Sequence, residues 1–79
     1  MDEKVILLIL EKIYRKVFSN ESLIITREMS ATNVDEWTSL NHMILISEIE
    51  EAFSIKFKLK DLNRMHNTGD LIDIIVSKL

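Results

Sequence analysis

Two neighbouring hydroxyl side chains mark the segment of this chain with the most evident chemical potential. Thr38 and Ser39 immediately precede a helical run, Leu40 to Phe53. The first turn of a helix presents unpaired N–H groups and the positive end of the helix dipole, and both favour a phosphate esterified to a serine. Ser39 is therefore either a helix cap, worth about 1 kcal/mol, or a site of modification. Thr38 serves equally well as the cap, so both interpretations stay open.

The side chains that could act in catalysis or bind a metal do not form a recognisable constellation. His42 and His66 have no cysteine and no HExxH-type spacing around them, so no metal site is predicted. Ser39 and His42 stand three residues apart, but no third orienting group or oxyanion motif accompanies them. We therefore expect a protein that is not an enzyme and has no catalytic residue.

The composition describes a small unit stabilised by packing alone. The chain has 79 residues, 47% of them hydrophobic, and no cysteine, so we expect a single domain over residues 1–79 without disulfides. Its longest apolar run, Val5 to Leu10, is far shorter than the roughly 20 residues of a membrane span, which predicts a soluble, cytoplasmic protein. The net charge of −3 argues against binding to nucleic acid.

The absence of proline and the presence of one glycine, Gly69, favour helices throughout. We predict an all-α fold, a small four-helix bundle of three main helices and one short helix with a long first loop. The first helix runs from an Asp2 cap to near Phe18, and the loop covers residues 19–37. The second helix starts at the hydroxyl pair, Asp61 caps the short helix, and Thr68 caps the last one.

Apolar residues in the irregular segments and in the last helix are expected to face the core. In the long loop these anchors are Leu23, Ile24, Ile25, Val34 and Trp37. Ser54 to Lys60 alternates apolar and basic residues, which predicts an extended connector with Ile55, Phe57 and Leu59 inward. The last helix has its buried face at Leu71, Ile72, Ile75 and Leu79.

The second helix carries two apolar strips, whereas an ordinary surface helix needs one. The strip suited to the core consists of His42, Leu45, Ile46, Ile49 and Phe53. A second strip, about 100° round the helix by its period, consists of Leu40, Met43, Ile44 and Ser47 and is bordered by Glu48 and Glu51. This second strip is either covered by the long loop or left free for a partner.

The segments WTSLNHMILISEIEEAFSIKF and NTGDLIDIIVSKL, with the long loop before them, resemble the acyl carrier protein family, also called phosphopantetheine-binding or peptidyl-carrier domains. The resemblance implies that Ser39 receives a 4'-phosphopantetheine arm from coenzyme A through a phosphopantetheinyl transferase. The arm then holds an acyl or aminoacyl group as a thioester for loading and accepting enzymes. It also implies a monomer whose partners dock on Leu40, Met43, Ile44, Glu48 and Glu51.

One position departs from the pattern of that family. Thr38 stands where the family usually has an aspartate that assists the metal-dependent transfer of the arm. The alternative is therefore an unmodified or degenerate carrier-fold module that binds another protein through the second helix. The basic residues between Lys56 and Arg64 have no role assigned by the resemblance.

Overall fold

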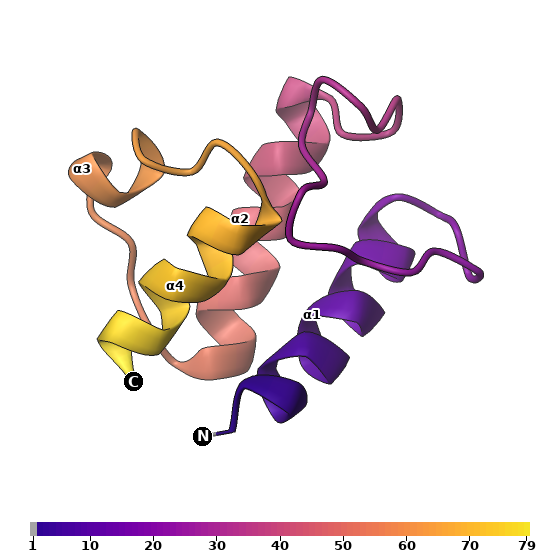
Figure 1. The fold of residues 1–79 in the computed structure, drawn as a ribbon. Helices are drawn as coiled ribbons and strands as arrows, with labels where there is room; N and C mark the ends of the chain where they lie inside the picture. The colour runs from indigo at the N-terminus through magenta and orange to yellow at the C-terminus, as the bar shows by residue number, and fades with distance from the viewer. Residues whose placement is uncertain (1) are drawn as a thin grey trace.

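The computed structural model describes residues 2–79, which form four α-helices and no strand (Figure 1). The helices are α1 (Glu3–Val17), α2 (Ser39–Phe53), α3 (Leu59–Leu62) and α4 (Thr68–Lys78). Three long helices, one short helix and a long loop between α1 and α2 confirm the predicted all-α architecture. The first turn of α1 and the last turn of α4 lie at the lower end of the bundle in Figure 1, away from the start of α2.

Helix α1 begins where the sequence predicts. The Oδ1 atom of Asp2 accepts a hydrogen bond from the Lys4 N–H at 3.0 Å, so Asp2 is the N-cap. The helix ends before Ser19, whose φ of 53° is left-handed and turns the chain into the loop. Its buried residues, Ile6, Leu10, Ile13 and Tyr14, line one face.

The hydrophobic core lies where α1, α2 and α4 meet. Helix α2 contributes Leu45, Ile49 and Phe53, all buried, whereas His42 and Ile46 of the same strip are only half-buried. Helix α4 contributes Leu71, Ile72, Ile74 and Ile75. Phe18, Val34, Trp37 and Ile55 from the connecting segments complete the cluster. In so small a domain this shared core is the main source of stability.

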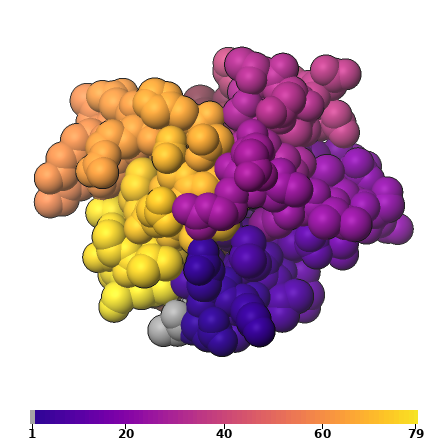
Figure 2. Space-filling model, in the orientation of Figure 1, coloured from indigo at the N-terminus to yellow at the C-terminus, as the bar shows by residue number. Residues whose placement is uncertain are grey.

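The long loop crosses the molecule and is bonded to the beginning of α4. Figure 2 shows it running over one face from the end of α1 toward α3 and α4. The backbone N–H groups of Thr68 and Gly69 donate to the carbonyls of Met29 and Arg27, both at 2.9 Å. The Arg27 guanidinium also binds Glu3 of α1 and Asp73 of α4. The prediction that Ile24 is a loop anchor was wrong, because its side chain is 72% exposed.

The connector between α2 and α3 covers residues 54–58, which are not helical, and it is shorter than predicted because Leu59 and Lys60 belong to α3. It is also packed only in part as predicted. Ile55 is buried and Phe57 is half-buried, whereas Leu59 is 75% exposed, so its inward assignment was wrong. Leu59 begins α3, and the helical turn there ends the alternation. The Oε2 atom of Glu50 accepts from the Phe57 N–H at 2.8 Å and holds the connector against α2.

Two predicted helix caps were assigned to the wrong residues. Asp61 is the third residue of α3 rather than its cap, and its buried carboxylate accepts from the Lys58 N–H and pairs with Lys78, each at 2.8 Å. The hydrogen bond from Lys78, followed by that from the Lys58 backbone, lowers the pKa of Asp61. Asp61 thus joins α3 to the end of α4.

Thr68 likewise does not cap α4, because the side chain of Asn67 accepts from the Asp70 N–H at 2.8 Å and performs that role. Thr68 is the first residue of the helix and is fully buried. Its hydroxyl lies 3.0 Å from the Tyr14 hydroxyl and 3.3 Å from the Met29 carbonyl oxygen. At the other end of α4, Leu79 is 51% exposed and does not extend the buried face as predicted.

Tyr14→Phe should reduce the free energy of unfolding by about 1 kcal/mol at neutral pH, because the buried Tyr14–Thr68 hydrogen bond is lost. Urea unfolding of both proteins measures this difference. Thr68 retains the Met29 carbonyl as an acceptor in the variant. A variant as stable as the parent would show that this hydrogen bond contributes nothing.

Because of Tyr14, the only tyrosine in the chain, we expect the protein to lose stability at high pH. Burial raises the pKa of Tyr14 from 10.0 to about 12, against a smaller lowering by the Thr68 hydrogen bond. As the pH rises, the unfolded chain therefore loses the phenol proton before the folded protein does. The contribution of Tyr14 to the free energy of unfolding is fully present below the pKa of the unfolded chain, and it is lost as the pH rises toward the pKa of the folded protein. Unfolding free energies across this range should fall more steeply for the parent than for Tyr14→Phe, and parallel curves would contradict the assignment.

Candidate functional site

Thr38, and not Ser39, is the N-cap of α2. Its backbone is extended, with φ −81° and ψ 169°, and its hydroxyl accepts a hydrogen bond from the Asn41 N–H at 3.1 Å. The His42 N–H donates to the Thr38 carbonyl at 2.8 Å, which closes the first turn. The interpretation of Ser39 as the cap was therefore wrong. The Thr38 hydroxyl caps the helix, and the Ser39 hydroxyl does not.

Ser39 is the first residue of α2 and is exposed to solvent. Within residues 2–79 its hydroxyl has no hydrogen-bonding partner, in contrast to that of Thr38. The first turn of α2 contains no acidic residue, so no carboxylate opposes a negative group at this position. A group attached to the Ser39 oxygen would displace no contact of the fold.

Trp37 fixes the position of the loop end, and therefore of Thr38 and Ser39, which follow it. Its indole is 7% exposed and meets Tyr14 and Phe18 of α1 edge-on or tilted, at ring-centroid distances of 5.4 and 5.6 Å. The Asn41 side chain donates to the Glu36 carbonyl at 2.8 Å and ties the loop end to α2 from the other side. The start of α2 is therefore held by contacts both before and after the hydroxyl pair.

The Trp37 indole also binds His42, a contact that the sequence did not reveal. Trp37 Nε1–H donates to His42 Nδ1 at 3.0 Å, and the two rings stack with centroids 6.1 Å apart. Because Nδ1 is the acceptor, the neutral ring carries its proton on Nε2. Burial lowers the pKa of His42 from 6.5, so the neutral form predominates at pH 7. A tryptophan five residues before a histidine at a helix start was the only signal available.

A groove of about 440 Å³ opens beside Ser39. One wall is the start of α2 and the loop end, and the other is the segment between α3 and α4. Its lining residues are Ala31, Trp37, Thr38, Ser39, His42, Met43, Met65 and His66. The groove is thus lined by the free Ser39 hydroxyl, by the Trp37–His42 pair and by two methionines.

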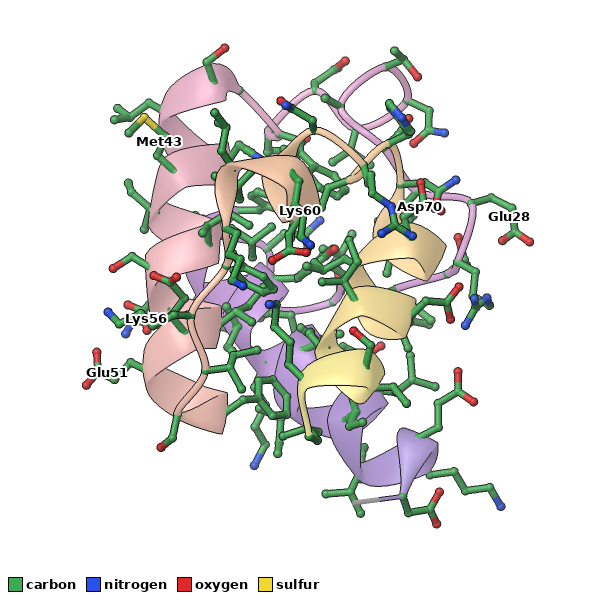
Figure 3. All side chains as sticks on the ribbon, turned by 90° about the vertical axis from the view of Figure 1, so that its left-hand side faces the viewer. Glu28, Met43, Glu51, Lys56, Lys60 and Asp70 are labelled. Atoms are coloured by element: carbon green, nitrogen blue, oxygen red, sulfur yellow. The ribbon has the colours of Figure 1, made fainter. Side chains whose placement is uncertain are left out.

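The second apolar strip of α2 is open to solvent. Leu40 is 68%, Met43 71% and Ile44 42% exposed, so the loop does not cover them. Glu51 is also exposed, and Figure 3 shows Met43 and Glu51 projecting from the same edge of α2. These residues form one accessible face of the helix.

Glu48, predicted as part of the same face, has a different environment. Its carboxylate lies 3.0 Å from Lys16 Nζ of α1, and its side chain is 32% exposed. This ion pair reduces the charge that Glu48 presents to an approaching molecule. Glu51 remains the acidic residue of the predicted face that makes no salt bridge within residues 2–79.

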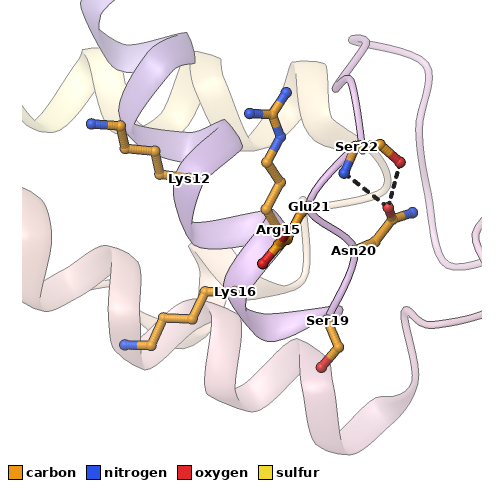
Figure 4. A pocket seen from close by; sticks show the side chains of 7 residues that line it. All are labelled: Lys12, Arg15, Lys16, Ser19, Asn20, Glu21 and Ser22. Atoms are coloured by element: carbon orange, nitrogen blue, oxygen red, sulfur yellow. Dashed lines mark hydrogen bonds between the residues drawn. The ribbon is translucent and has the colours of Figure 1, made fainter.

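A second cavity lies at the end of α1, on a different part of the surface (Figure 4). It is lined by Lys12, Arg15, Lys16, Ser19, Asn20, Glu21 and Ser22. Arg15 already donates to the Leu23 carbonyl at 2.7 Å and pairs with Glu11, and Lys16 pairs with Glu48. These cations stabilise the fold, and the site at Ser39 is the better candidate for chemistry.

Neither a metal site nor a membrane-spanning helix occurs among residues 2–79. No cluster of three or more histidine, cysteine, aspartate or glutamate side chains with the geometry of a metal site occurs in this part of the chain. None of its helices is long and apolar enough to span a membrane.

A solved structure closely resembles the chain. A holo acyl carrier protein from Geobacter metallireducens, determined by solution NMR, is 44% identical over 91% of this chain and 83% of its own, with a TM-score of 0.85. No family model and no curated protein matches.

This similarity in both sequence and fold shows that the chain belongs to the acyl carrier protein family. The protein therefore has a carrier role and is not itself an enzyme, as the sequence predicted.

The separation of cap and free hydroxyl predicts different stabilities for two alanine variants. Thr38→Ala should lower the free energy of unfolding by about 1 kcal/mol, because the Asn41 N–H loses its acceptor. Ser39→Ala should leave it unchanged within a few tenths of a kcal/mol. Urea unfolding of both variants tests this, and a Ser39→Ala variant as destabilised as Thr38→Ala would refute the cap assignment.

Proposed function

We propose that Ser39 carries a 4'-phosphopantetheine arm, which holds an acyl or aminoacyl group as a thioester and delivers it to separate enzymes. The observation that carries this proposal is the exposed Ser39 hydroxyl, unpartnered among residues 2–79, in a member of the acyl carrier protein family. The related Geobacter protein is a holo form, which supports modification in this chain. When bound, the arm supplies the thiol that forms the thioester.

The local electrostatics suit a phosphodiester on Ser39. The first N–H groups of α2 and the positive end of its dipole lie at this residue, and the first turn contains no carboxylate. Thr38 already satisfies the Asn41 N–H, so attachment of the arm leaves the cap in place. These features support attachment of the arm at Ser39 with the cap of α2 kept.

Thr38 in place of aspartate affects the transfer of the arm rather than the fold. A threonine hydroxyl and an aspartate carboxylate both cap helices, so either residue starts α2. Only the carboxylate adds negative charge for the metal-assisted transfer expected from the resemblance. We infer that modification depends on a transferase able to act without that carboxylate, or that uses Asp35 or Glu36 nearby.

The exposed face of α2 is the proposed docking surface for the transferase and for the loading and accepting enzymes. Leu40, Met43 and Ile44 offer apolar contact, and Glu51 offers an accessible negative charge beside them. Such a surface suits partners with a basic rim around an apolar patch, and favours fast, reversible association. Glu48 contributes less, because Lys16 neutralises it.

The arm should be added to Ser39 and to no other residue. After incubation with coenzyme A, Mg²⁺ and a broad-specificity phosphopantetheinyl transferase, intact mass should show one arm on the parent and none on Ser39→Ala, because the variant lacks the accepting oxygen. Thr38→Asp should raise the initial rate of loading by restoring the carboxylate. Addition to Ser39→Ala would refute the site.

Failure of the parent and of Thr38→Asp to load, with the helical fold confirmed by circular dichroism, would instead favour an unmodified module that binds a partner through α2. In that case Ser39→Ala would keep partner binding, and Met43→Asp would abolish it.

Glu51→Lys should slow association with the transferase several-fold at low salt, because it reverses an accessible charge on the docking face. Glu28→Lys is a matched control with the same change in net charge, since Glu28 is exposed at the opposite edge of the molecule in Figure 3. Stopped-flow association rates at low and high salt measure both. Equal slowing by the two variants would contradict steering through α2.

A further inference from the structure

The Nε2–H group of His42 is a hydrogen-bond donor without a partner among residues 2–79. Nδ1 is occupied by the Trp37 indole, and no residue of the described chain accepts from Nε2. No side-chain nitrogen or oxygen among these residues is buried without a hydrogen bond, so Nε2 is open to solvent. His42 also lines the groove beside Ser39. The groove therefore contains an oriented, available donor.

The donor is placed within reach of a group on Ser39. Residues three apart on a helix share a face, with Cβ atoms about 5–6 Å apart. Ser39 and His42 have this spacing and line the same groove. A phosphorus atom bonded to the Ser39 oxygen would project from that face, which brings its free oxygens toward the imidazole.

We propose that His42 Nε2–H donates a hydrogen bond to the phosphodiester of the arm and positions the arm along this groove. The inference rests on the proposed function, because it requires the arm on Ser39. His42 acts here as a binding and positioning residue, and no chemical step passes through it.

Trp37 makes this donor dependable by fixing the imidazole. A free neutral histidine exchanges its proton between the two nitrogens and rotates its ring. Trp37 Nε1–H donates to Nδ1 at 3.0 Å, which is possible only in the tautomer protonated on Nε2, and the stacked indole limits the rotation of the ring. Trp37 is itself packed against Tyr14 and Phe18. The core thus holds the Trp37 indole in place, and the indole in turn orients the Nε2–H donor of His42.

The remaining walls of the groove suit an arm of mixed polarity. Met43, Met65 and Ala31 provide apolar surface, and flexible methionines adapt to an apolar chain. Among residues 2–79, no carboxylate, lysine or arginine lines the groove, and its only other titratable side chain is His66 from the segment between α3 and α4. A phosphodiester would therefore be the dominant charge beside His42.

Attachment of the arm should shift the titration of His42 in a defined direction. In the unmodified protein burial lowers its pKa, and protonation of Nδ1 would also break the Trp37 hydrogen bond. A neighbouring phosphodiester anion favours the imidazolium, so the pKa of His42 should be higher in the holo form than in the apo form. A structural role alone would not produce this difference.

The test is a comparison of apo and holo protein by NMR, with the arm confirmed by intact mass. Imidazole resonances, assigned with His66→Gln, should show a higher titration midpoint for His42 in the holo form. The ³¹P resonance should show an inflection at that same midpoint, because a phosphodiester itself does not titrate in this range. Equal His42 midpoints in the two forms would overturn the inference while leaving the proposed function intact.

Two variants separate the residues of the groove. His42→Asn keeps an acceptor near Nδ1 for Trp37 but removes the distal donor, so the ³¹P inflection should disappear. His66→Gln is the matched control and should retain it. An inflection lost in His66→Gln and kept in His42→Asn would overturn the assignment to His42. If neither the parent nor Thr38→Asp takes up an arm, the proposed function fails and this inference with it.

Discussion

The packing of Trp37 against α1 is the contact on which the site depends. The turns of the loop between α1 and α2 are local, so a contact with another element has to fix where its last residues lie on the molecule. The indole, buried against Tyr14 and Phe18 of the first helix and its end, makes that contact. The cap, the free serine and the orientation of His42 all follow within five residues of this anchor. A core interaction thereby sets the geometry of a surface site.

The long helices could be predicted from the sequence because their signals are local. The apolar periods of α1, α2 and α4 and the Asp2 cap each depend on residues within a few turns of one another. The resemblance to the carrier family also rests on continuous segments. Ser39 could be singled out for the same reason, and its role as the attachment point remains a prediction.

The caps could not be chosen correctly where two capping residues are adjacent, because distant contacts decide between them. Asn67 caps α4 since the Thr68 hydroxyl is taken by Tyr14 and Met29. Asp61 is the third residue of α3, where its carboxylate accepts from the Lys58 N–H and pairs with Lys78 of α4. The Trp37–His42 bond was missed for a related reason: it needs a ring geometry that spacing alone does not specify. Local propensity is a weak guide wherever such tertiary bonds compete.

The bonds from the long loop to α4 have a consequence for how the protein is made. Met29 and Arg27 reach their backbone partners only at Thr68 and Gly69, near the end of the chain. During synthesis from the N-terminus, α1, the loop and Ser39 are translated before those partners. The loop then lacks its attachment to α4, although Ser39 has already been translated. The site around Ser39 therefore reaches its final structure only after α4 has been made. A nascent chain that ends before Thr68 carries Ser39 without the bonds that attach the loop to α4.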